Sequence, residues 1–432
     1  MKVIHLSQTD AGAGAGRAAY RIHRALLASG VASSMIVGDK RTADETVLSA
    51  HDGWRGRVQS RTFSYLEAKL AHQDAIGEAG FVSPARFGYF NPSTDPRVCA
   101  ASVVSLYWIN GGFIRPEGLA RLTMPVVWRL SDTWPFSGGC HYPGGCDRFT
   151  EQCGECPQLA KRSPADRSRQ LWQRKQRAWR SLDLTIAAPS QWIAELARRS
   201  SLFGERPIVV IPTGVDIERF RPIDRLQARA RFGIPQDRFI LMFGALDPEG
   251  DSRKGFRQLR AALDILGRDA SCTNSLAVVF GKQASSDRGE FPVPAIFLGQ
   301  LDGDDTLAAA YSAADVVIVP SLEDNLPNVA IEAIACGTPV VGFDVSGMPE
   351  IVRHQWNGYL AKHTDGAELA EGIRWTLQDV NRLEALRQNA RKFAEEHFDL
   401  RRQGGHYLAL YDDLLAHRVS TGRERSRGMP NG

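Results

Sequence analysis

The residues from Asp315 to Phe343 restrict the fold more than any other part of the chain. Four consecutive aliphatic residues, Val316–Val319, are typical of a strand that is buried on both faces of a parallel sheet. Pro327 and Asn328 predict a helix start, because proline suits the first turn and asparagine can cap free backbone N–H groups. Gly337 predicts the end of this helix before a second aliphatic strand. Strand, helix and strand in this order indicate an α/β fold.

The predicted helix start at Asn328 is also a candidate anion site. A helix that begins at the carboxyl ends of parallel strands presents unpaired N–H groups and the positive end of its dipole to a phosphate. Glu332 lies about one turn inside the helix, where its carboxylate can accept hydrogen bonds from a ribose diol. The segment therefore predicts a nucleotide site.

Length and charge exclude several classes of protein. The chain has 432 residues, 43% hydrophobic and 24% charged, which favours a globular protein of two domains. A net charge of +4 from 53 basic and 49 acidic residues does not indicate a nucleic-acid partner. The start lacks the apolar segment of a signal peptide, and seven cysteines fit a reducing compartment better than a disulfide scaffold. We expect a cytoplasmic protein.

Basic residues gather between Lys161 and Arg180, a stretch with eight Lys or Arg and one Asp. Leu171, Trp172 and Trp179 are interleaved with them. One interpretation is a basic helix that rests on an anionic membrane surface, at the inner face of the cell membrane. The alternative is a solvated helix whose tryptophans cover part of a core.

The N-terminus has the order strand, glycine loop, helix. Val3–Leu6 predicts a short strand, and the loop Asp10–Gly16 leads into an amphipathic helix. Gly14 and Gly16 would let the backbone approach a donor phosphate closely. Their spacing is G-x-G-x-G, which differs from the dinucleotide pattern, and we find no acidic residue at the ribose position of such a site.

Strand-like and helix-like segments alternate twice along the chain. The predicted strands after the first lie at 101–109, 125–130, 184–187, 208–212, 239–244, 276–280, 295–298 and 315–319. Residues 40–97 are treated as an irregular insertion that is helical in part near Phe63–Leu70. A last helix is predicted at Tyr407–His417, and the tail behind it, rich in Arg, Ser and Gly, is expected to be disordered.

A pair of cations follows the strand at 239–244. Arg253 and Lys254 precede Gly255 at the start of the next predicted helix. Such a pair can hold a diphosphate and stabilise the charge that grows on it as it leaves. The alternative, two exposed residues at a helix start, is disfavoured because cations oppose the helix dipole there.

Four of the seven cysteines fall within residues 140–156: Cys140, Cys146, Cys153 and Cys156. Tetrahedral zinc fits four sulfurs, and the closing C-x-x-C is typical of a metal loop. Two disulfides and unligated thiols are the alternatives. Zinc here would be structural, since four protein ligands leave no position for substrate. The other cysteines, Cys99, Cys272 and Cys336, are predicted to be small core residues.

Two residues of the first half are candidate contacts for an acceptor. Trp108 lies at the end of a predicted strand, where ligands bind in open α/β sheets, so its ring can stack on a sugar. His141 beside Cys140 is either a spare metal ligand or a packing or acceptor-contact residue. An ordinary core aromatic is the alternative for Trp108.

Taken together, these segments resemble the retaining glycosyltransferases of the GT-B fold, in particular the large family 4, glycosyl transferases group 1. The resemblance is carried by the glycine loop and by residues 189–190, 211–216, 253–255, 297–299, 311–315 and 320–341. It implies two Rossmann-like domains with the acceptor bound by the first, the donor mainly by the second, and catalysis in the cleft. It implies an N-terminal domain at 1–205, a C-terminal domain at 206–398, a helix at 399–418 that packs back on the first domain, and a tail at 419–432.

The resemblance also implies roles for the residues before and within the helix of the opening segment. Asp324 or Glu323 would contact hydroxyls of the donor sugar, with Asp324 in place of the usual glutamate. Backbone N–H groups of Asn325 and Leu326 would reach the phosphate, and Glu332 the ribose.

The chain departs from the family at two positions. Ser131 stands where many relatives have a histidine, and it cannot carry a positive charge near neutral pH. Asp132 is then the expected acceptor-side base or orienting group, with a structural turn residue as the alternative. Ala245 replaces an arginine that often follows the first strand of the second domain, and Arg253 is expected to supply that charge.

The function that the resemblance implies is transfer of a hexose, with retained configuration, from a GDP- or UDP-sugar to a glycan or lipid-linked acceptor. A role in surface polysaccharide assembly is expected by analogy. No metal cofactor is required, because fixed cations neutralise the diphosphate. The alternatives are a nucleotide-sugar-binding partner subunit with little activity, and a GT-B sugar-nucleotide epimerase.

Overall fold

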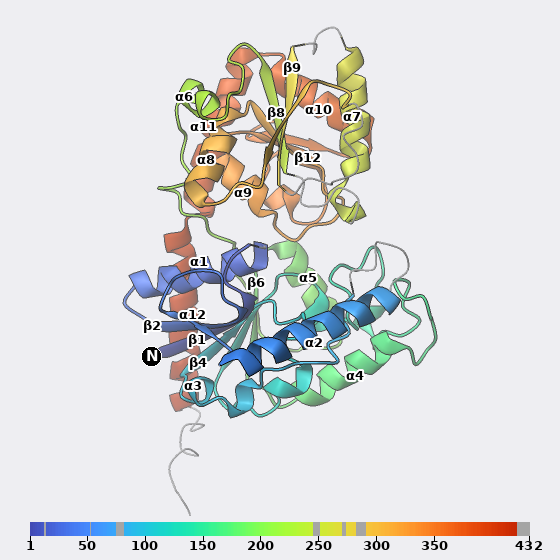
Figure 1. Cartoon of the computed structure of the whole chain (residues 1–432), viewed down its shortest axis with the longest axis vertical. Helices are drawn as coiled ribbons and strands as arrows, with labels where there is room; N and C mark the ends of the chain where they lie inside the picture. Colours follow the sequence, from blue (N-terminus) through green and yellow to red (C-terminus); the bar gives the residue numbers. More distant parts are fainter. Residues whose placement is uncertain are drawn as a thin grey trace, which may run out of the picture. The chain divides into compact units, whose positions relative to one another are not determined.

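The computed structural model in Figure 1 describes residues 1–12, 14–51, 53–74, 82–244, 251–269, 274–281 and 291–420. The chain divides into two compact units, each built on its own parallel sheet. Unit 1 consists of residues 1–189, 193–212 and the chain from Leu400 onward, and unit 2 of residues 190–192 and 213–399. The predicted α/β class with two Rossmann-like domains is confirmed. The chain passes from unit 1 into unit 2 after residue 212, whereas we had predicted this domain boundary after residue 205.

Unit 1 has a seven-stranded parallel sheet with the order β3-β2-β1-β4-β5-β6-β7. Its strands are β1 (Lys2–Thr9), β2 (Ala32–Asp39), β3 (Val47–Ser49), β4 (Val103–Leu106), β5 (Val126–Arg129), β6 (Leu184–Ala188) and β7 (Ile208–Val210). The strand order reverses between β1 and β4, and the loops at the carboxyl ends of strands beside such a point are where open α/β sheets bind ligands.

The helices of unit 1 cover this sheet. They are α1 (Gly14–Ala28), α2 (Gly53–Asp74), α3 (Pro96–Cys99), α4 (Arg167–Trp179), most of α5 (Gln191–Arg199) and α12 (Leu400–Ser420). Helix α12 packs on α1, and Tyr407 and Tyr411 are fully buried in the same core as β1. A Cβ on Gly404 would lie 2.9 Å from the Cβ of Ala25, so a glycine lets these two helices approach closely. The last helix thus completes the core of unit 1.

Unit 2 has a six-stranded parallel sheet with the order β10-β9-β8-β11-β12-β13. The strands are β8 (Phe239–Gly244), β9 (Ser275–Phe280), β10 (Ala295–Gly299), β11 (Val316–Val319), β12 (Val340–Phe343) and β13 (Gly358–Ala361). The helices are α6 (Arg225–Arg231), α7 (Phe256–Arg268), α8 (Asp304–Ala313), α9 (Asn328–Ala335), α10 (Gly366–Leu377) and α11 (Val380–His397). Helices α8, α9 and α11 cover one face of the sheet and α7 and α10 the other, as Figure 1 shows. The order reverses between β8 and β11.

Several elements escaped prediction. Residues 40–97 were expected to be irregular apart from helix near Phe63–Leu70; that helix is present but extends over all of α2, and strand β3 was missed. Strand β2 ends at Asp39, so an acidic residue does stand at the end of the second strand, where we had expected none. Its carboxylate is paired with Arg41 at 2.9 Å. The tail expected to be disordered begins at residue 419, but Val419 and Ser420 still belong to α12, and residues 421–432 lie outside the described residues.

The basic stretch forms helix α4, and its tryptophans lie in the core. Trp172 and Trp179 are each 3% exposed, and the Trp179 ring centroid is 4.9 Å from that of Trp128. The tryptophans therefore cover part of the core, as the alternative interpretation expected, and contact of the basic residues with a membrane stays a prediction. In the described part of the chain, no helix is long and apolar enough to cross a membrane.

Candidate functional site

A glycine brings the cation pair against the end of strand β11. Gly255 has a φ of +69°, and a Cβ there would lie 1.8 Å from the carbonyl oxygen of Pro320. Only glycine permits both the left-handed backbone and this contact. The backbone N–H of Leu322 donates to the carbonyl of Arg253 at 2.7 Å. The 3-10 turn Ser252–Lys254 is thus fixed beside the loop at the carboxyl end of β11.

Both cations of this turn have carboxylate partners. Lys254 Nζ lies 2.6 Å from Asp324 Oδ2, and Arg253 Nη2 lies 2.6 Å from Asp251 Oδ2. Arg253 also donates through Nη1 to the backbone carbonyl of Glu323 at 3.2 Å. The structure therefore brings together Asp324 and the two cations, all of which were predicted to bind the donor sugar nucleotide. Asp324 takes part in this cluster through its carboxylate, and Glu323 through its backbone carbonyl.

The loop between β11 and α9 is held tightly. A Cβ on Gly347 would lie 1.6 Å from the carbonyl oxygen of Asn325, and the N–H of Gly347 donates to the carbonyl of Asp324 at 3.1 Å. Ser190, which belongs to unit 2, donates through Oγ to Asn325 Oδ1 at 2.7 Å. Asn325 and Leu326 are buried. Their contact with phosphate stays a prediction.

Helix α9 begins at Asn328 with Pro327 as its N-cap, and no side chain caps it. The expectation that Asn328 is the capping residue is therefore wrong, because Asn328 is already the first helical residue. An uncapped helix start keeps its dipole available to an anion. Glu332 lies one turn inside, 1% exposed, and accepts a hydrogen bond from the Tyr311 hydroxyl at 3.1 Å. Its contact with ribose stays a prediction.

The glycines of the N-terminal loop differ in surroundings. A Cβ on Gly16 would lie 2.8 Å from the carbonyl oxygen of Thr9, so this glycine allows α1 to pack on the end of β1. Gly14 is exposed at the start of α1. Packing accounts for Gly16, and phosphate contact by Gly14 and Gly16 stays a prediction.

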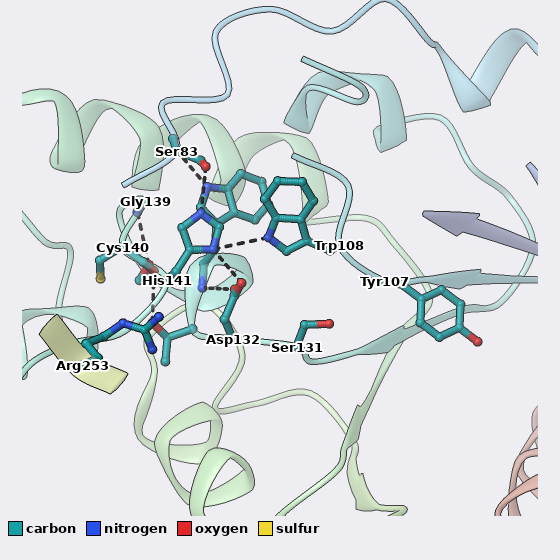
Figure 2. A network of polar contacts seen from close by, with 12 residues as sticks. Ser83, Tyr107, Trp108, Ser131, Asp132, Gly139, Cys140, His141 and Arg253 are labelled. Carbon is teal, nitrogen blue, oxygen red and sulfur yellow. Dashed lines mark hydrogen bonds and ion pairs between the residues drawn. The ribbon is translucent and has the colours of Figure 1, made fainter. Parts of the chain in front are cut away.

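Unit 1 holds a buried pair of Asp132 and His141, drawn in Figure 2. Asp132 Oδ2 lies 2.6 Å from His141 Nδ1, and Asp132 Oδ1 accepts from the backbone N–H of Trp134 at 2.9 Å. The two residues are 6% and 2% exposed. One oxygen of Asp132 therefore holds the turn after β5 and the other contacts an imidazole, while an acceptor-side role of Asp132 stays a prediction.

The contacts of His141 define its protonation pattern. Ser83 Oγ lies 2.7 Å from Nε2, and the indole N–H of Trp108 lies 3.4 Å from Nδ1. The shorter contact to Asp132 requires a hydrogen on Nδ1, so Nε2 accepts the Ser83 hydroxyl hydrogen in the neutral ring. Trp108 then stacks obliquely beside the imidazole, with ring centroids 5.8 Å apart.

The remaining unit 1 candidates flank this pair. Trp108 is half-buried, whereas its neighbour Tyr107 is in the core, 2% exposed. Ser131 is half-buried and accepts from Arg129 Nη1 at 3.4 Å. Ser83 was missed, because it lies in the stretch treated as an irregular insertion. Its place follows from the bridge between Val82 and Cys140, which the sequence does not signal.

The four clustered cysteines line one cavity of about 20 Å³ and form no disulfide. Burial raises the pKa of Cys140 to about 12 and that of Cys153 to about 11, so these thiols are neutral without a bound cation. Among the described residues, no three His, Cys, Asp or Glu side chains are arranged as a metal site. Cys336 is buried as predicted, Cys99 is exposed and contradicts the prediction, and Cys272 lies outside the described residues.

The family model for glycosyl transferases group 1 matches residues 224–393, which lie in unit 2. The similarity to this family therefore lies in unit 2. D-inositol 3-phosphate glycosyltransferase 1 of Catenulispora acidiphila is 36% identical over 231 residues, which cover 48% of this chain and 54% of that protein. The chain thus spans about half the length of this curated relative.

Solved structures show that the chain has a GT-B fold. Sucrose-phosphate synthase from Thermosynechococcus elongatus matches with a TM-score of 0.63 at 18% identity, over 96% of this chain and 100% of that chain. Anabaena Alr3699/HepE in complex with UDP-glucose matches with a TM-score of 0.62 at 17% identity, over 98% of this chain and 100% of that chain. The predicted GT-B fold is confirmed. Ala245, the position of the missing arginine, lies outside the described residues.

Proposed function

We propose that this protein transfers a hexose from a nucleotide diphosphate sugar to a glycan or lipid-linked acceptor and retains the configuration at the sugar. The observation that carries the proposal is the contact between Lys254 and Asp324 at the end of β11. Lys254 is a cation that can bind a phosphate, and Asp324 is a carboxylate that can bind sugar hydroxyls. Both groups lie in the family match of unit 2. The complex of Alr3699/HepE with UDP-glucose supports UDP-sugars as the first donors to test, with GDP-sugars beside them.

On the donor side, the diphosphate competes with Asp324 for Lys254. Lys254 is 39% exposed and Asp324 14% exposed, so an incoming anion can reach the ammonium group. A diphosphate carries more charge than one carboxylate and attracts the cation more strongly. Asp324 is then free to accept hydrogen bonds from the sugar, while Lys254 and Arg253 stabilise the leaving diphosphate. Its oxygen can itself take the proton of the acceptor from the same face.

The nucleoside would lie near the start of α9. The uncapped N-terminus attracts the phosphate, and Glu332 accepts the ribose hydroxyls in addition to Tyr311. Gly14 and Gly16 of the N-terminal loop complete the proposed donor contacts. Because cations of the chain neutralise the diphosphate, no metal cofactor is required for transfer.

On the acceptor side, Asp132 serves to orient His141. Both carboxylate oxygens are already engaged, by the Trp134 N–H and by His141. We therefore assign Asp132 as an orienting group, and His141 with Trp108 and Ser131 as acceptor-side contacts. His141 therefore supplies an imidazole to unit 1, in which Ser131 stands in place of the histidine that many relatives have.

The acceptor class includes phosphorylated polyols. The curated relative named above is a D-inositol 3-phosphate glycosyltransferase, and the chain matches about half of it. Inositol phosphates therefore enter the acceptor panel beside glycans and lipid-linked sugars. Surface polysaccharide assembly stays part of the proposal.

Contact with an anionic membrane is proposed through α2, since the tryptophans of α4 are buried. Trp54, Val58 and Tyr65 are 68%, 54% and 66% exposed, and their spacing places them on one side of the helix around Arg61. Exposed apolar rings among cations are typical of a surface that lies on anionic lipid. Cosedimentation with phosphatidylglycerol vesicles tests it, and Trp54→Ala should reduce binding while high salt weakens it.

A donor and acceptor panel tests the function. Purified protein is incubated with UDP- and GDP-hexoses, with and without acceptors, and nucleotide release and product anomers are measured. Acceptor-dependent release with a retained anomer supports the proposal. Binding without release indicates the partner subunit suggested by Ser131, and conversion of the donor to its epimer indicates the epimerase.

A further inference from the structure

The four cysteines of residues 140–156 surround one small cavity in unit 1, although they come from three separate turns. Cys140 follows the 3-10 turn Trp134–Phe136, Cys146 precedes the 3-10 turn Arg148–Thr150, and Cys153 and Cys156 share the next loop. All four line the same cavity of about 20 Å³. That volume is about the size of a water molecule or a single ion. The fold therefore converges four sulfurs on the space that one ion needs.

Glycines hold the loop in the conformation that turns these sulfurs inward. A Cβ on Gly138 would lie 2.8 Å from the Cβ of Cys153, and a Cβ on Gly154 would lie 2.7 Å from the carbonyl oxygen of Pro164. Cys153 itself has a φ of 55° and Glu155 a φ of 44°, which non-glycine residues rarely adopt. Two neighbouring residues in this strained region require support from their surroundings.

Backbone amides point at the sulfurs of the C-x-x-C turn. The N–H of Gly138 donates to Cys153 Sγ at 3.1 Å. Burial raises the pKa of the Cys156 thiol, and the backbone N–H groups of Gln158 and Leu159, which bond to its sulfur, oppose this shift. Donors of this kind stabilise and orient metal-bound thiolates, whereas a disulfide sulfur is a much weaker acceptor.

We propose that Cys140, Cys146, Cys153 and Cys156 bind one structural Zn²⁺ ion. Four thiolates supply the tetrahedral sulfur set that zinc prefers, and they leave no position for a substrate. On binding, four S–H bonds give up their protons to water and four Zn–S bonds form, without any change in oxidation state. The described side chains do not form a metal group in this structure, so binding of the ion would require the four cysteine side chains to move closer together.

A buried lysine balances the charge of such a centre. Four thiolates and one Zn²⁺ carry a net charge of −2, which is costly to bury unless it is compensated. Lys175 of α4 is 0% exposed, donates to the carbonyl of Ser137 at 3.0 Å and interacts electrostatically with Cys140 and Cys153. Burial lowers the pKa of Lys175, but its ammonium form would offset part of this charge.

The metal loop also carries His141. Thr133 donates through Oγ1 to the carbonyl of Cys140 at 3.0 Å and through its N–H to the carbonyl of His141 at 2.9 Å. Zinc at Cys140 would hold this backbone and so keep His141 against Asp132. Any effect of zinc loss on transfer rests on the proposed function, but zinc binding itself does not.

The test measures metal and thiols in the full-length protein, purified without chelator. We expect one zinc per chain by plasma mass spectrometry and all seven cysteines reactive after denaturation with EDTA. X-ray absorption at the zinc edge should show sulfur neighbours at about 2.3 Å. Less than about 0.1 zinc per chain, oxygen and nitrogen neighbours only, or loss of four reactive thiols to two disulfides would each overturn the proposal.

Variants identify the ligands. Cys153→Ser should lower zinc content at least about tenfold, while Cys99→Ser, at an exposed cysteine outside the loop, should leave it unchanged. Lys175→Met should weaken zinc retention against a chelator by about 10- to 100-fold, and Arg177→Met, at an exposed position of the same helix, should not. Equal zinc content in Cys153→Ser and wild type overturns the ligand set. Inactive protein that still holds zinc would count against the proposed function and leave the zinc site standing.

Discussion

Lys254 Nζ lies 2.6 Å from Asp324 Oδ2, although 70 residues separate them. The contact exists because Gly255 lets the turn before α7 lie on the carbonyl of Pro320 at the end of β11. An ammonium group and a carboxylate thus lie together at the switch point between β8 and β11, where we propose that a phosphate and a sugar hydroxyl bind.

Removing this cation should slow transfer. We expect Lys254→Ala to lower kcat/KM for the donor at least about tenfold, because the leaving diphosphate loses a stabilising charge. The control is Lys392→Ala, which removes an exposed lysine from α11 and should leave kinetics unchanged. Equal kcat/KM in wild type and Lys254→Ala would remove Lys254 from the site.

Glu332 should contribute to nucleotide affinity. Glu332→Ala is expected to weaken UDP binding by about tenfold or more in calorimetry, since a ribose contact is lost. Tyr311→Phe removes only the hydroxyl at 3.1 Å and should change affinity much less. A Glu332→Ala protein that is folded and binds UDP as tightly as wild type would contradict the ribose assignment.

Asp132 should act through the orientation of His141. In Asp132→Asn the amide can present an N–H toward Nδ1, which disrupts the hydrogen bond that fixes the tautomer. We expect transfer to fall by about 10²-fold or more with UDP affinity unchanged, because neither Asp132 nor His141 is among the proposed nucleotide contacts. Ser83→Ala, which loses the contact to Nε2, should give a smaller decrease. Normal transfer by Asp132→Asn would assign Asp132 to the turn alone.

Asp315 should be important for stability. Its carboxylate lies 2.7 Å from both Arg225 and Arg229 and accepts from the N–H of Ile240 at 2.7 Å, in a position only 2% exposed. Asp315→Ala leaves the buried Arg229 without this partner and should lower the free energy of unfolding by about 3 to 5 kcal/mol in urea. Glu384→Ala, at an exposed site, should change it by less than about 0.5 kcal/mol. Similar losses in both variants would contradict this role.

Unit 1 should lose stability on mild acidification. Burial lowers the pKa of His23 from 6.5 to about 4, and the ring nitrogens contact Ser33 at 2.7 Å and Thr46 at 2.9 Å. The unfolded chain therefore binds a proton at His23 near pH 6.5, whereas the folded unit binds it only near pH 4. As a result, the contribution of His23 to the free energy of unfolding is complete above pH 6.5 and declines toward pH 4. The decline from this residue should reach about 3 kcal/mol.

Denaturation at several pH values checks this sign. His23→Gln removes the titrating group, so its free energy of unfolding should vary less with pH than that of wild type between pH 6.5 and 4. Identical pH slopes for the two proteins would show that His23 titrates alike in the folded and unfolded chains.

The sequence predicted local patterns well. The strand, loop and helix around Pro320–Asn328 are contiguous, and their signals come from residues next to one another. Strand β13 is short, and β2 begins with Ala32-Ser33-Ser34, so neither shows a long aliphatic run. The pattern of aliphatic residues that predicts a strand was therefore weak in β2 and β13.

Contacts between distant segments could not be predicted. The approach of Gly255 to Pro320 depends on packing of a whole βα unit, and nothing near Ser83 announces its contact with His141. The sequence indicated Asp132 and His141 separately, yet their pairing required the turn from Thr133 to Cys140 to close. Residue types predict candidate chemistry, and tertiary packing decides which of them meet.

Acceptor-dependent release of nucleotide from a UDP- or GDP-hexose, measured for wild type and Lys254→Ala in parallel, tests the central claim most directly. We predict release by wild type that persists during brief exposure to EDTA and falls at least about tenfold in the variant. Absence of release from every donor, or equal release by the two proteins, would contradict the donor site at Lys254 and Asp324.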